Sequence, residues 1–423
     1  MSGNTMLHAP PSRNLKRYLQ FSLLLLAAGA IYPLLYLRQN FETSVLAAFG
    51  ISADELGQFY SLLGIIYALS YLPSGWLADR FSPRLLICFS LSVVGLLGLW
   101  FSTYPGPAAL RWIFIGWGLA AGLTFWASLI KGVKLLAQAS EQGRFFGILD
   151  GGRGLIEALL ATAAVALFAM ASDAAPQAAL RPVIYMYSFT CLAIALLVLV
   201  FLGQEPAAAP GPTKVRGGLW QDLKTLAAIP RLWLMALIIF CGYQIFWATY
   251  SFSAYLQQGY GMSAVAAGVI TVIKLWMRPV GGIVGGFLGD RCGNAATLAW
   301  SMLLAALGLT ALILFPAGSG VYFLLTLVIL IGVMTYAIRG LYWSLLESCA
   351  VPEKITGLAI GIVSVIAYLP DIFLPMINSA ISHHYPGLPG YKIYFGYIVA
   401  CGLGGTAVAF YFKNLTQREK VQQ

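Results

Sequence analysis

The chain has 423 residues, of which 60% are hydrophobic and only 9% are charged. A soluble globular domain carries a charge at roughly a quarter of its positions, so this composition excludes an ordinary soluble protein and indicates an integral membrane protein embedded in a lipid bilayer. The formal net charge of +10 does not indicate a nucleic-acid partner, because the basic residues are scattered between apolar runs and form no continuous stripe.

Twelve apolar segments are long enough to cross a bilayer, whose hydrocarbon core of about 30 Å requires about 20 residues of helix. We therefore predict an all-α integral membrane fold with twelve transmembrane helices. The predicted spans cover residues 18–38, 54–77, 85–103, 109–134, 144–170, 182–202, 232–256, 263–288, 295–315, 320–346, 355–380 and 391–412.

The distribution of positive charge predicts the orientation of these spans. With the amino terminus inside, most of the 25 lysines and arginines fall in cytoplasmic segments, whereas Arg111, Arg181 and Lys392 fall on the opposite side. Because positively charged connections tend to stay in the cytoplasm, we expect both termini to be cytoplasmic, in a bacterial inner membrane.

The longest connection between predicted spans covers residues 204–230. It begins with the sequence EPAAAPGP and continues with basic residues, which is typical of a flexible cytoplasmic linker. This linker would join an N-terminal six-helix bundle, residues 1–203, to a C-terminal six-helix bundle, residues 231–423.

A charged motif recurs in the two halves of the chain. Gly75–Arg84 reads GWLADRFSPR between the second and third apolar segments, and Gly286–Arg291 reads GFLGDR at the matching place in the second half. Such a recurrence indicates two pseudo-symmetric copies of one unit. The motif resembles the signature loop of the major facilitator superfamily of membrane transporters, whose two six-helix halves are repeats.

This resemblance implies that the motif latches one conformation of a transporter and does not bind substrate. In the second copy, Cys292, Gly293 and Asn294 replace the downstream basic residue of the first copy. The implied gating residues are Gly75, Asp79, Arg80, Arg84, Gly286, Asp290 and Arg291.

Basic residues within or near the predicted spans are not explained by orientation. An ionised side chain at the centre of a bilayer costs at least about 2.5–3.5 kcal/mol on insertion scales, so each of them is a candidate functional residue. They could instead form structural pairs with intramembrane acids, but the candidate acids are fewer, and the excess of positive charge favours an anionic substrate. The bases are Arg38, Arg153, Lys274, Arg278 and Arg339, and the acids are Asp150, Glu157, Glu347 and Asp371.

The fifth predicted helix carries Asp150, Arg153 and Glu157 at positions i, i+3 and i+7. This spacing places all three on one face of a helix, so Arg153 can pair with either acid. The triad either stabilises helix packing or exchanges partners as a substrate anion and a proton bind. We expect proton coupling to involve Asp150 and Glu157, with Glu157 as the preferred carrier and Asp371 in reserve.

The eighth predicted helix carries Lys274 and Arg278 on one face, four residues apart. Like charges in hydrocarbon repel each other unless a negative group lies between them, and that group could be Asp371 or the substrate. Aromatic side chains accompany two other bases, since Tyr36 precedes Arg38 and Tyr336 precedes Arg339. Such aromatic residues either pack the helices or help to bind a planar or sugar-like anion.

Two further sequence features narrow the resemblance. LRQNF at 37–41, followed by the motif loop, resembles the organophosphate/organic-anion branch of the superfamily. The resemblance to this branch implies that Arg38 binds an anionic group of the substrate. It also implies that Arg153 occupies the position of a substrate-binding histidine in helix 5, and that Lys131 occupies the position of a basic residue late in helix 4. The branch's second arginine, in helix 7, is replaced here by the sequence GYQI at 242–245.

The segments at 140–154 and 386–396 most closely resemble the YihN-type permeases, carriers ascribed to a sulfonated sugar. Members of that type also place basic residues where Arg278 and Arg339 stand.

The sequence therefore predicts a secondary active transporter that moves a small organic anion by alternating access: a sugar sulfonate, sugar phosphate, sugar acid or carboxylate. The chain contains no nucleotide-binding motif, so its energy would come from proton symport or anion exchange. The alternatives are a proton-driven multidrug exporter, which would need an acid-rich cavity, and a membrane receptor, which would normally carry a soluble output domain. We expect a monomer without enzymatic activity or cofactor. The six cysteines lie singly and predict neither a disulfide nor a metal site.

Overall fold

The computed structural model describes residues 11–136, 142–171, 174–203, 219–314, 320–352 and 355–422, and within these ranges the chain forms helices and no strand. The elements of the first half are α1 (Pro11–Leu35), α2 (Arg38–Phe49), α3 (Ala53–Arg80), α4 (Pro83–Phe101), α5 (Pro107–Gly118), the π-helix η1 (Leu119–Phe125), α6 (Trp126–Leu136), α7 (Gln142–Ala169) and α8 (Pro176–Phe201).

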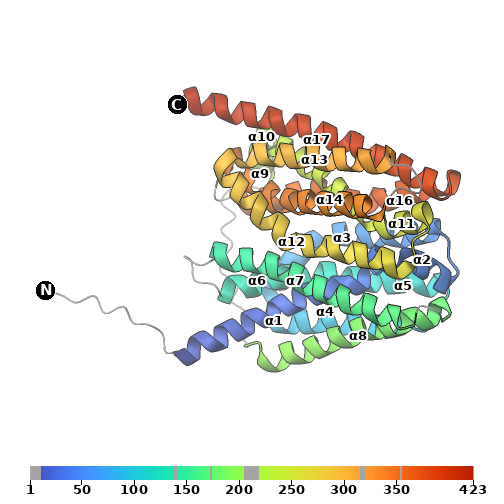
Figure 1. Ribbon diagram of the computed structural model, residues 1–423. Helices are drawn as coiled ribbons and strands as arrows, with labels where there is room; N and C mark the ends of the chain where they lie inside the picture. The colour runs from blue at the N-terminus through green and yellow to red at the C-terminus, as the bar shows by residue number, and fades with distance from the viewer. Residues whose placement is uncertain are drawn as a thin grey trace.

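The second half is coloured from yellow-green to red in Figure 1. Its elements are α10 (Pro230–Ala248), the short 3₁₀ helix η3 (Thr249–Ser251), α11 (Phe252–Tyr260), α12 (Ala264–Cys292), α13 (Asn294–Leu314), α14 (Val321–Leu341), the 3₁₀ helix η4 (Tyr342–Cys349), α15 (Thr356–Ala367), α16 (Pro370–His384) and α17 (Leu388–Gln422).

The helices match the predicted spans. In the described residues, 11 continuous helical segments are long and apolar enough to cross a membrane. The remaining predicted span, residues 54–77, coincides with α3, a helix of 28 residues. The predicted all-α membrane fold is confirmed, and the described helices are consistent with the predicted count of twelve spans.

Several predicted spans are interrupted in the structure. A turn at Tyr36 and Leu37 separates α1 from α2, η3 follows α10 without a gap, and a turn at Tyr368 and Leu369 separates α15 from α16. Broken helices are tolerated in membranes where the irregular backbone is buried in protein or faces a cavity. Each of these breaks brings a tyrosine to the centre of the molecule.

The predicted linker is partly helical. Residues 219–227 form α9 (Leu219–Ala227), whose sequence LWQDLKTLA has apolar and polar faces. Residues 204–218 lie outside the described residues. The exact boundaries of the two bundles stay a prediction, with α8 ending at Phe201 and α10 beginning at Pro230.

Helices of the two halves meet along two seams, where α3 packs on α16 and α7 packs on α12. The first seam is a close contact between backbones. A β-carbon at Gly64 of α3 would lie 2.6 Å from the carbonyl carbon of Asp371 in α16, and one at Gly57 would lie 2.8 Å from the carbonyl oxygen of Pro375. Glycine at these positions therefore allows the two halves to approach each other.

Candidate substrate-binding site

A cavity of about 1000 Å³ lies between the two halves. Its lining includes Ser74, Gly75 and Ala78 from the carboxyl end of α3 and Lys134 from the end of α6. In Figure 1, α1 begins and α17 ends at one end of the bundle, and α6, which carries Lys134 in its last turn, ends there as well. The cavity therefore opens toward the end of the molecule that bears the termini.

At the opposite end the two halves pack against each other. The ring of Tyr36 from the first half stacks on that of Tyr250 from the second, with centroids 5.2 Å apart. Beyond this stack, the Ser253 hydroxyl donates a hydrogen bond of 2.9 Å to the carbonyl oxygen of Asn40, and the Ser379 hydroxyl donates one to the Asp54 carboxylate. These contacts form the floor of the cavity.

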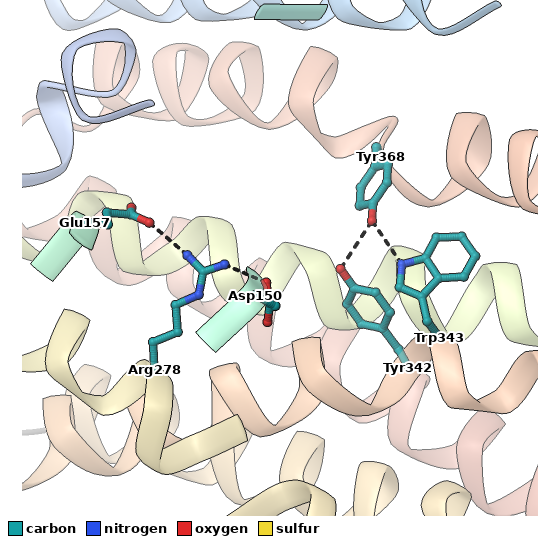
Figure 2. Close-up of polar contacts among 6 residues, drawn as sticks. All are labelled: Asp150, Glu157, Arg278, Tyr342, Trp343 and Tyr368. Atoms are coloured by element: carbon teal, nitrogen blue, oxygen red, sulfur yellow. Dashed lines mark hydrogen bonds and ion pairs between the residues drawn. The ribbon is translucent and has the colours of Figure 1, made fainter. Parts of the chain in front are cut away.

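Arg278 of α12 forms ion pairs with two carboxylates of α7 (Figure 2). Its Nη1 lies 2.8 Å from Glu157 Oε2, and its Nη2 lies 2.9 Å from Asp150 Oδ1. The stem of Arg278 passes Gly154, where a β-carbon would lie 2.8 Å from Arg278 Cγ. The two acids do share one face of the helix, but they bind an arginine of the other half. The expected pairing of Arg153 with these acids is therefore wrong.

Arg153 instead lies on aromatic rings. Its guanidinium carbon lies 4.6 Å from the ring centroid of Tyr32 and 5.6 Å from that of Trp126. Its Nε is buried and has no hydrogen-bond partner, and no carboxylate of the described residues lies within 4 Å of its nitrogens. Arg153 thus presents an uncompensated positive charge to the cavity from the first half.

Arg339 of α14 presents a similar charge from the second half. Its guanidinium carbon lies 4.2 Å from the ring centroid of Phe246, and again no described carboxylate forms an ion pair with it. Nearby, the Tyr368 hydroxyl accepts a hydrogen bond of 3.4 Å from Trp343 Nε1 and lies 3.3 Å from the Tyr342 hydroxyl (Figure 2). Tyr336, a predicted binding residue, lies beneath Arg278, 5.9 Å from ring centroid to guanidinium carbon.

Asp371 lies in the first turn of α16 and lines the cavity. The Tyr243 hydroxyl donates a hydrogen bond of 2.8 Å to its Oδ1, and Trp247 Nε1 donates one of 2.7 Å to the same oxygen. Asp371, one of the two groups that could lie between Lys274 and Arg278, forms no ion pair with either base among the described residues. Both donors belong to α10, the helix that carries the GYQI substitution noted in the sequence.

Two of the predicted binding residues lie outside the cavity lining. Lys274 is fully buried, and its ammonium donates a hydrogen bond of 3.1 Å to the hydroxyl of Thr249 in η3. Arg38 lies beyond the helix break, where its Nη2 is 3.1 Å from Glu42 Oε2 and its guanidinium carbon is 5.0 Å from the Tyr60 ring. In this conformation neither base is available to a molecule in the cavity.

The predicted gating residues lie at the open end of the cavity. Lys131, expected to bind substrate, lines the mouth and donates a hydrogen bond of 2.5 Å to the carbonyl oxygen of Ala78, in the first motif. Gly75 lines the mouth as well. Arg84 has a buried Nε without a hydrogen-bond partner among the described residues, and the side chain of Asp79 does not belong to them.

The second motif ends α12 at the same end of the bundle. Arg291 stacks on Phe287 of its own helix, with its guanidinium carbon 4.6 Å from the ring centroid. Gly293 follows the last residue of α12 and has a φ of 88°, a backbone conformation that glycine adopts more readily than other residues. Arg80, Gly286 and Asp290 occupy the final turns of α3 and α12. The latch function of both motifs stays a prediction.

Sequence reasoning missed three polar partners in the membrane. Glu42 was overlooked because the first predicted span ended at Arg38, although its i+4 spacing from that arginine is visible in the sequence. Tyr243 and Trp247 gave a weaker signal, since two aromatic residues four apart are common in an apolar helix. Their role depends on Asp371, which lies more than a hundred residues further along the chain.

Known proteins resemble this chain over nearly its whole length. "Inner membrane protein YqcE" of Escherichia coli is 31% identical over 90% of both chains, and "Inner membrane protein YihN" of the same organism is 25% identical over 96% of this chain and 97% of that protein. "Probable galactarate/D-glucarate transporter GudP" of Pseudomonas putida is 24% identical over 79% of this chain and 78% of that protein.

A solved structure has the same fold. The bacterial homologue of the human lysosomal transporter Spinster, in an inward-facing and unoccupied conformation, matches 97% of this chain and 99% of its own with a TM-score of 0.77 at 16% identity. The profile of the Major Facilitator Superfamily matches residues 18–375. The chain is therefore a multi-pass membrane transporter and not an enzyme, and it belongs to the major facilitator superfamily.

Proposed function

We propose that this protein moves a small polyhydroxylated organic anion, most simply a sugar acid, across the membrane by alternating access. The observation that carries this proposal is the pair of uncompensated guanidinium groups, Arg153 from the first half and Arg339 from the second. A charge held away from water is costly unless a counter-charge accompanies it. An anion in the cavity supplies that counter-charge.

The rest of the lining suits a sugar-like molecule. The cavity is lined by eight tyrosines, whose rings offer apolar faces and whose hydroxyls donate and accept hydrogen bonds: Tyr32, Tyr36, Tyr67, Tyr71, Tyr243, Tyr250, Tyr336 and Tyr368. The name of the Pseudomonas putida relative refers to galactarate and glucarate, which carry a carboxylate at each end. Sugar phosphates and sugar sulfonates bear comparable anionic groups and belong to the same proposed class.

The proposal also includes the direction in which the cavity opens and the source of energy for transport. If both termini are cytoplasmic, as the charge distribution predicts, the cavity opens inward and its floor faces the outside. Transport then requires the α3–α16 and α7–α12 seams to open as the mouth closes. The energy would come from a proton gradient or from exchange of a second anion, and the protein would act as a monomer in a bacterial inner membrane.

A screen for thermal stabilisation tests the proposal. The purified protein is heated with galactarate, D-glucarate, D-gluconate, glucose 6-phosphate or a sugar sulfonate, because a true ligand at a hundredfold excess over its Kd stabilises the folded state by about 2.7 kcal/mol. We expect at least one anion to raise the melting temperature. No stabilisation by any of these classes would contradict the proposal.

Variants show whether a stabilising anion occupies this site. Arg153→Gln and Arg339→Gln should each weaken binding by roughly 10- to 100-fold, since a hydrogen bond to a charged group contributes about 1.5–3 kcal/mol. Arg111→Gln, at an exposed arginine of α5, is the matched control and should bind normally. Unchanged affinity in both cavity variants would exclude the two arginines as the anion site.

The alternative of a proton-driven multidrug exporter needs an acid-rich cavity for cationic drugs. The lining here contains five basic residues and two acidic ones: Lys131, Lys134, Arg153, Arg278 and Arg339 against Glu157 and Asp371. This composition disfavours a cationic substrate. Including organic cations in the same thermal screen discriminates between the two functions.

A further inference from the structure

Two carboxylates line the cavity, those of Glu157 and Asp371, and a third, that of Asp150, shares the arginine partner of Glu157. Asp150 and Glu157 each form an ion pair with Arg278. Protonating either of them breaks a charge-assisted contact. Asp371 forms no ion pair with any described residue, and its only hydrogen-bond donors are neutral.

The geometry at Asp371 leaves room for a proton. Tyr243 and Trp247 both donate to Oδ1, and no described residue donates to Oδ2. A proton placed on Oδ2 therefore disrupts neither hydrogen bond. The residue is 6% exposed and lines the cavity, so a proton can reach it from the solvent there without crossing packed protein.

The surroundings of Asp371 contain a single cation among the described residues. Besides its two donors on α10, the titratable groups that interact with the carboxylate are Arg339 of α14 and tyrosines from α1, α3, η3 and the turn between α1 and α2. The tyrosines are Tyr32, Tyr36, Tyr67, Tyr71 and Tyr250. Arg339 is also the guanidinium that is proposed to bind the substrate anion. The carboxylate of Asp371 and the substrate anion therefore interact with the same positive charge.

We propose that Asp371 is the proton-binding residue of this transporter and that it couples proton and anion movement through Arg339. This inference rests on the proposed function. An ionised Asp371 repels an anion that approaches Arg339, and the repulsion is strengthened because Asp371 is only 6% exposed. A proton on Oδ2 removes it, so proton and anion load together and each favours the binding of the other. The transferred proton comes from the solvent and returns to solvent when the anion leaves.

Infrared spectroscopy tests the proton site without requiring a substrate. The wild-type protein, titrated with acid, should develop the C=O stretching band of a protonated buried carboxyl group. The band should be absent from Asp371→Asn and present in Glu157→Gln. A band that persists in Asp371→Asn and disappears in Glu157→Gln would overturn the proposal and assign the proton to α7.

The variant Tyr243→Phe tests the same proton site if Asp371→Asn does not fold. It keeps the carboxylate and removes one of its two donors, so it should change the pH at which the band disappears. Tyr185→Phe, at an exposed tyrosine of α8, is the control and should leave that pH unchanged. Identical titrations for Tyr243→Phe and the wild type would count against Asp371.

Reconstituted protein then tests the coupling with D-glucarate as the probe. In the wild type, the Kd for D-glucarate should rise by up to about tenfold per pH unit once Asp371 is ionised. Asp371→Asn should bind with little dependence on pH and retain counterflow while losing glucarate-driven proton movement. Retained proton movement in Asp371→Asn would refute the coupling role. Absence of glucarate counterflow in the wild type would instead count against the proposed substrate, while the infrared titration still decides the proton site.

Discussion

Arg38 and Glu42 form an ion pair whose side chains are only 4% and 2% exposed. Removing one partner of a buried pair leaves the other charge without compensation, which typically costs about 3–5 kcal/mol. We expect Arg38→Gln to destabilise the protein by this order, and the double variant Arg38→Gln/Glu42→Gln to lose much less than the sum of the two single changes. Thermal unfolding in detergent, run as a double-mutant cycle, measures the difference.

The same cycle separates two roles for Arg38. If Arg38 were a substrate ligand in this conformation, the double variant would regain stability without regaining anion binding. Restored binding together with restored stability would identify the pair as structural. Purely additive stability losses would show that the ion pair contributes nothing beyond its separate members.

At the scale of single residues, the sequence predicted positions better than partners. The spacing of Asp150 and Glu157 placed both on one face of a helix, and the structure agrees. That spacing could not identify Arg278 as their common partner, because ion pairs depend on which helices come together. Three of the five predicted intramembrane bases line the cavity, and the other two are held by Glu42 and Thr249.

At the scale of elements, the crossing of α3 and α16 depends on Gly64. A methyl group there would collide with the backbone of Asp371, and overpacking of this kind typically costs about 1–3 kcal/mol. We expect Gly64→Ala to lower the melting temperature in detergent. Gly361→Ala in α15 is the matched control, since a β-carbon there meets no atom within 4 Å and alanine favours a helix by about 1 kcal/mol.

Equal melting temperatures for Gly64→Ala and Gly361→Ala would show that the two halves can separate at this crossing without loss. The positions of the spans could be predicted from the sequence, but the breaks within them could not. Hydropathy over about 20 residues located the spans, but it averages over the turns at Tyr36 and Tyr368. A proline stands near each break, Pro33 before Tyr36 and Pro370 after Tyr368, but other prolines lie within unbroken helices, so a proline alone does not locate a break.

At the scale of the whole molecule, the cavity is open at one end and packed at the other. In a background with all native cysteines replaced by serine, Ser364→Cys should react rapidly with a membrane-impermeant thiol reagent applied to the face that bears the termini, because Ser364 lines the cavity. Ser379→Cys should react slowly from either face, because that position is buried in the α3–α16 contact. D-Glucarate at saturating concentration should slow the reaction of Ser364→Cys.

The opposite labelling pattern would mean that the protein rests in a conformation open at the other end.

The family and the two-half fold could be predicted from the repeated charged motif, because that motif depends on a few residues at fixed places between spans. The identity of the anion could not be predicted from the sequence, because it depends on how side chains from at least six helices come together around the cavity.

Trp126 and Trp343 border the cavity, and Trp126 lies beneath the guanidinium of Arg153. The emission of an indole ring responds to nearby charge and to the loss of water around it. An anion that draws Arg153 away from Trp126 changes both. The protein therefore carries its own optical reporter of occupancy, and titrations of unlabelled protein can be read as changes in tryptophan fluorescence, with Trp126→Phe identifying the ring that gives the signal.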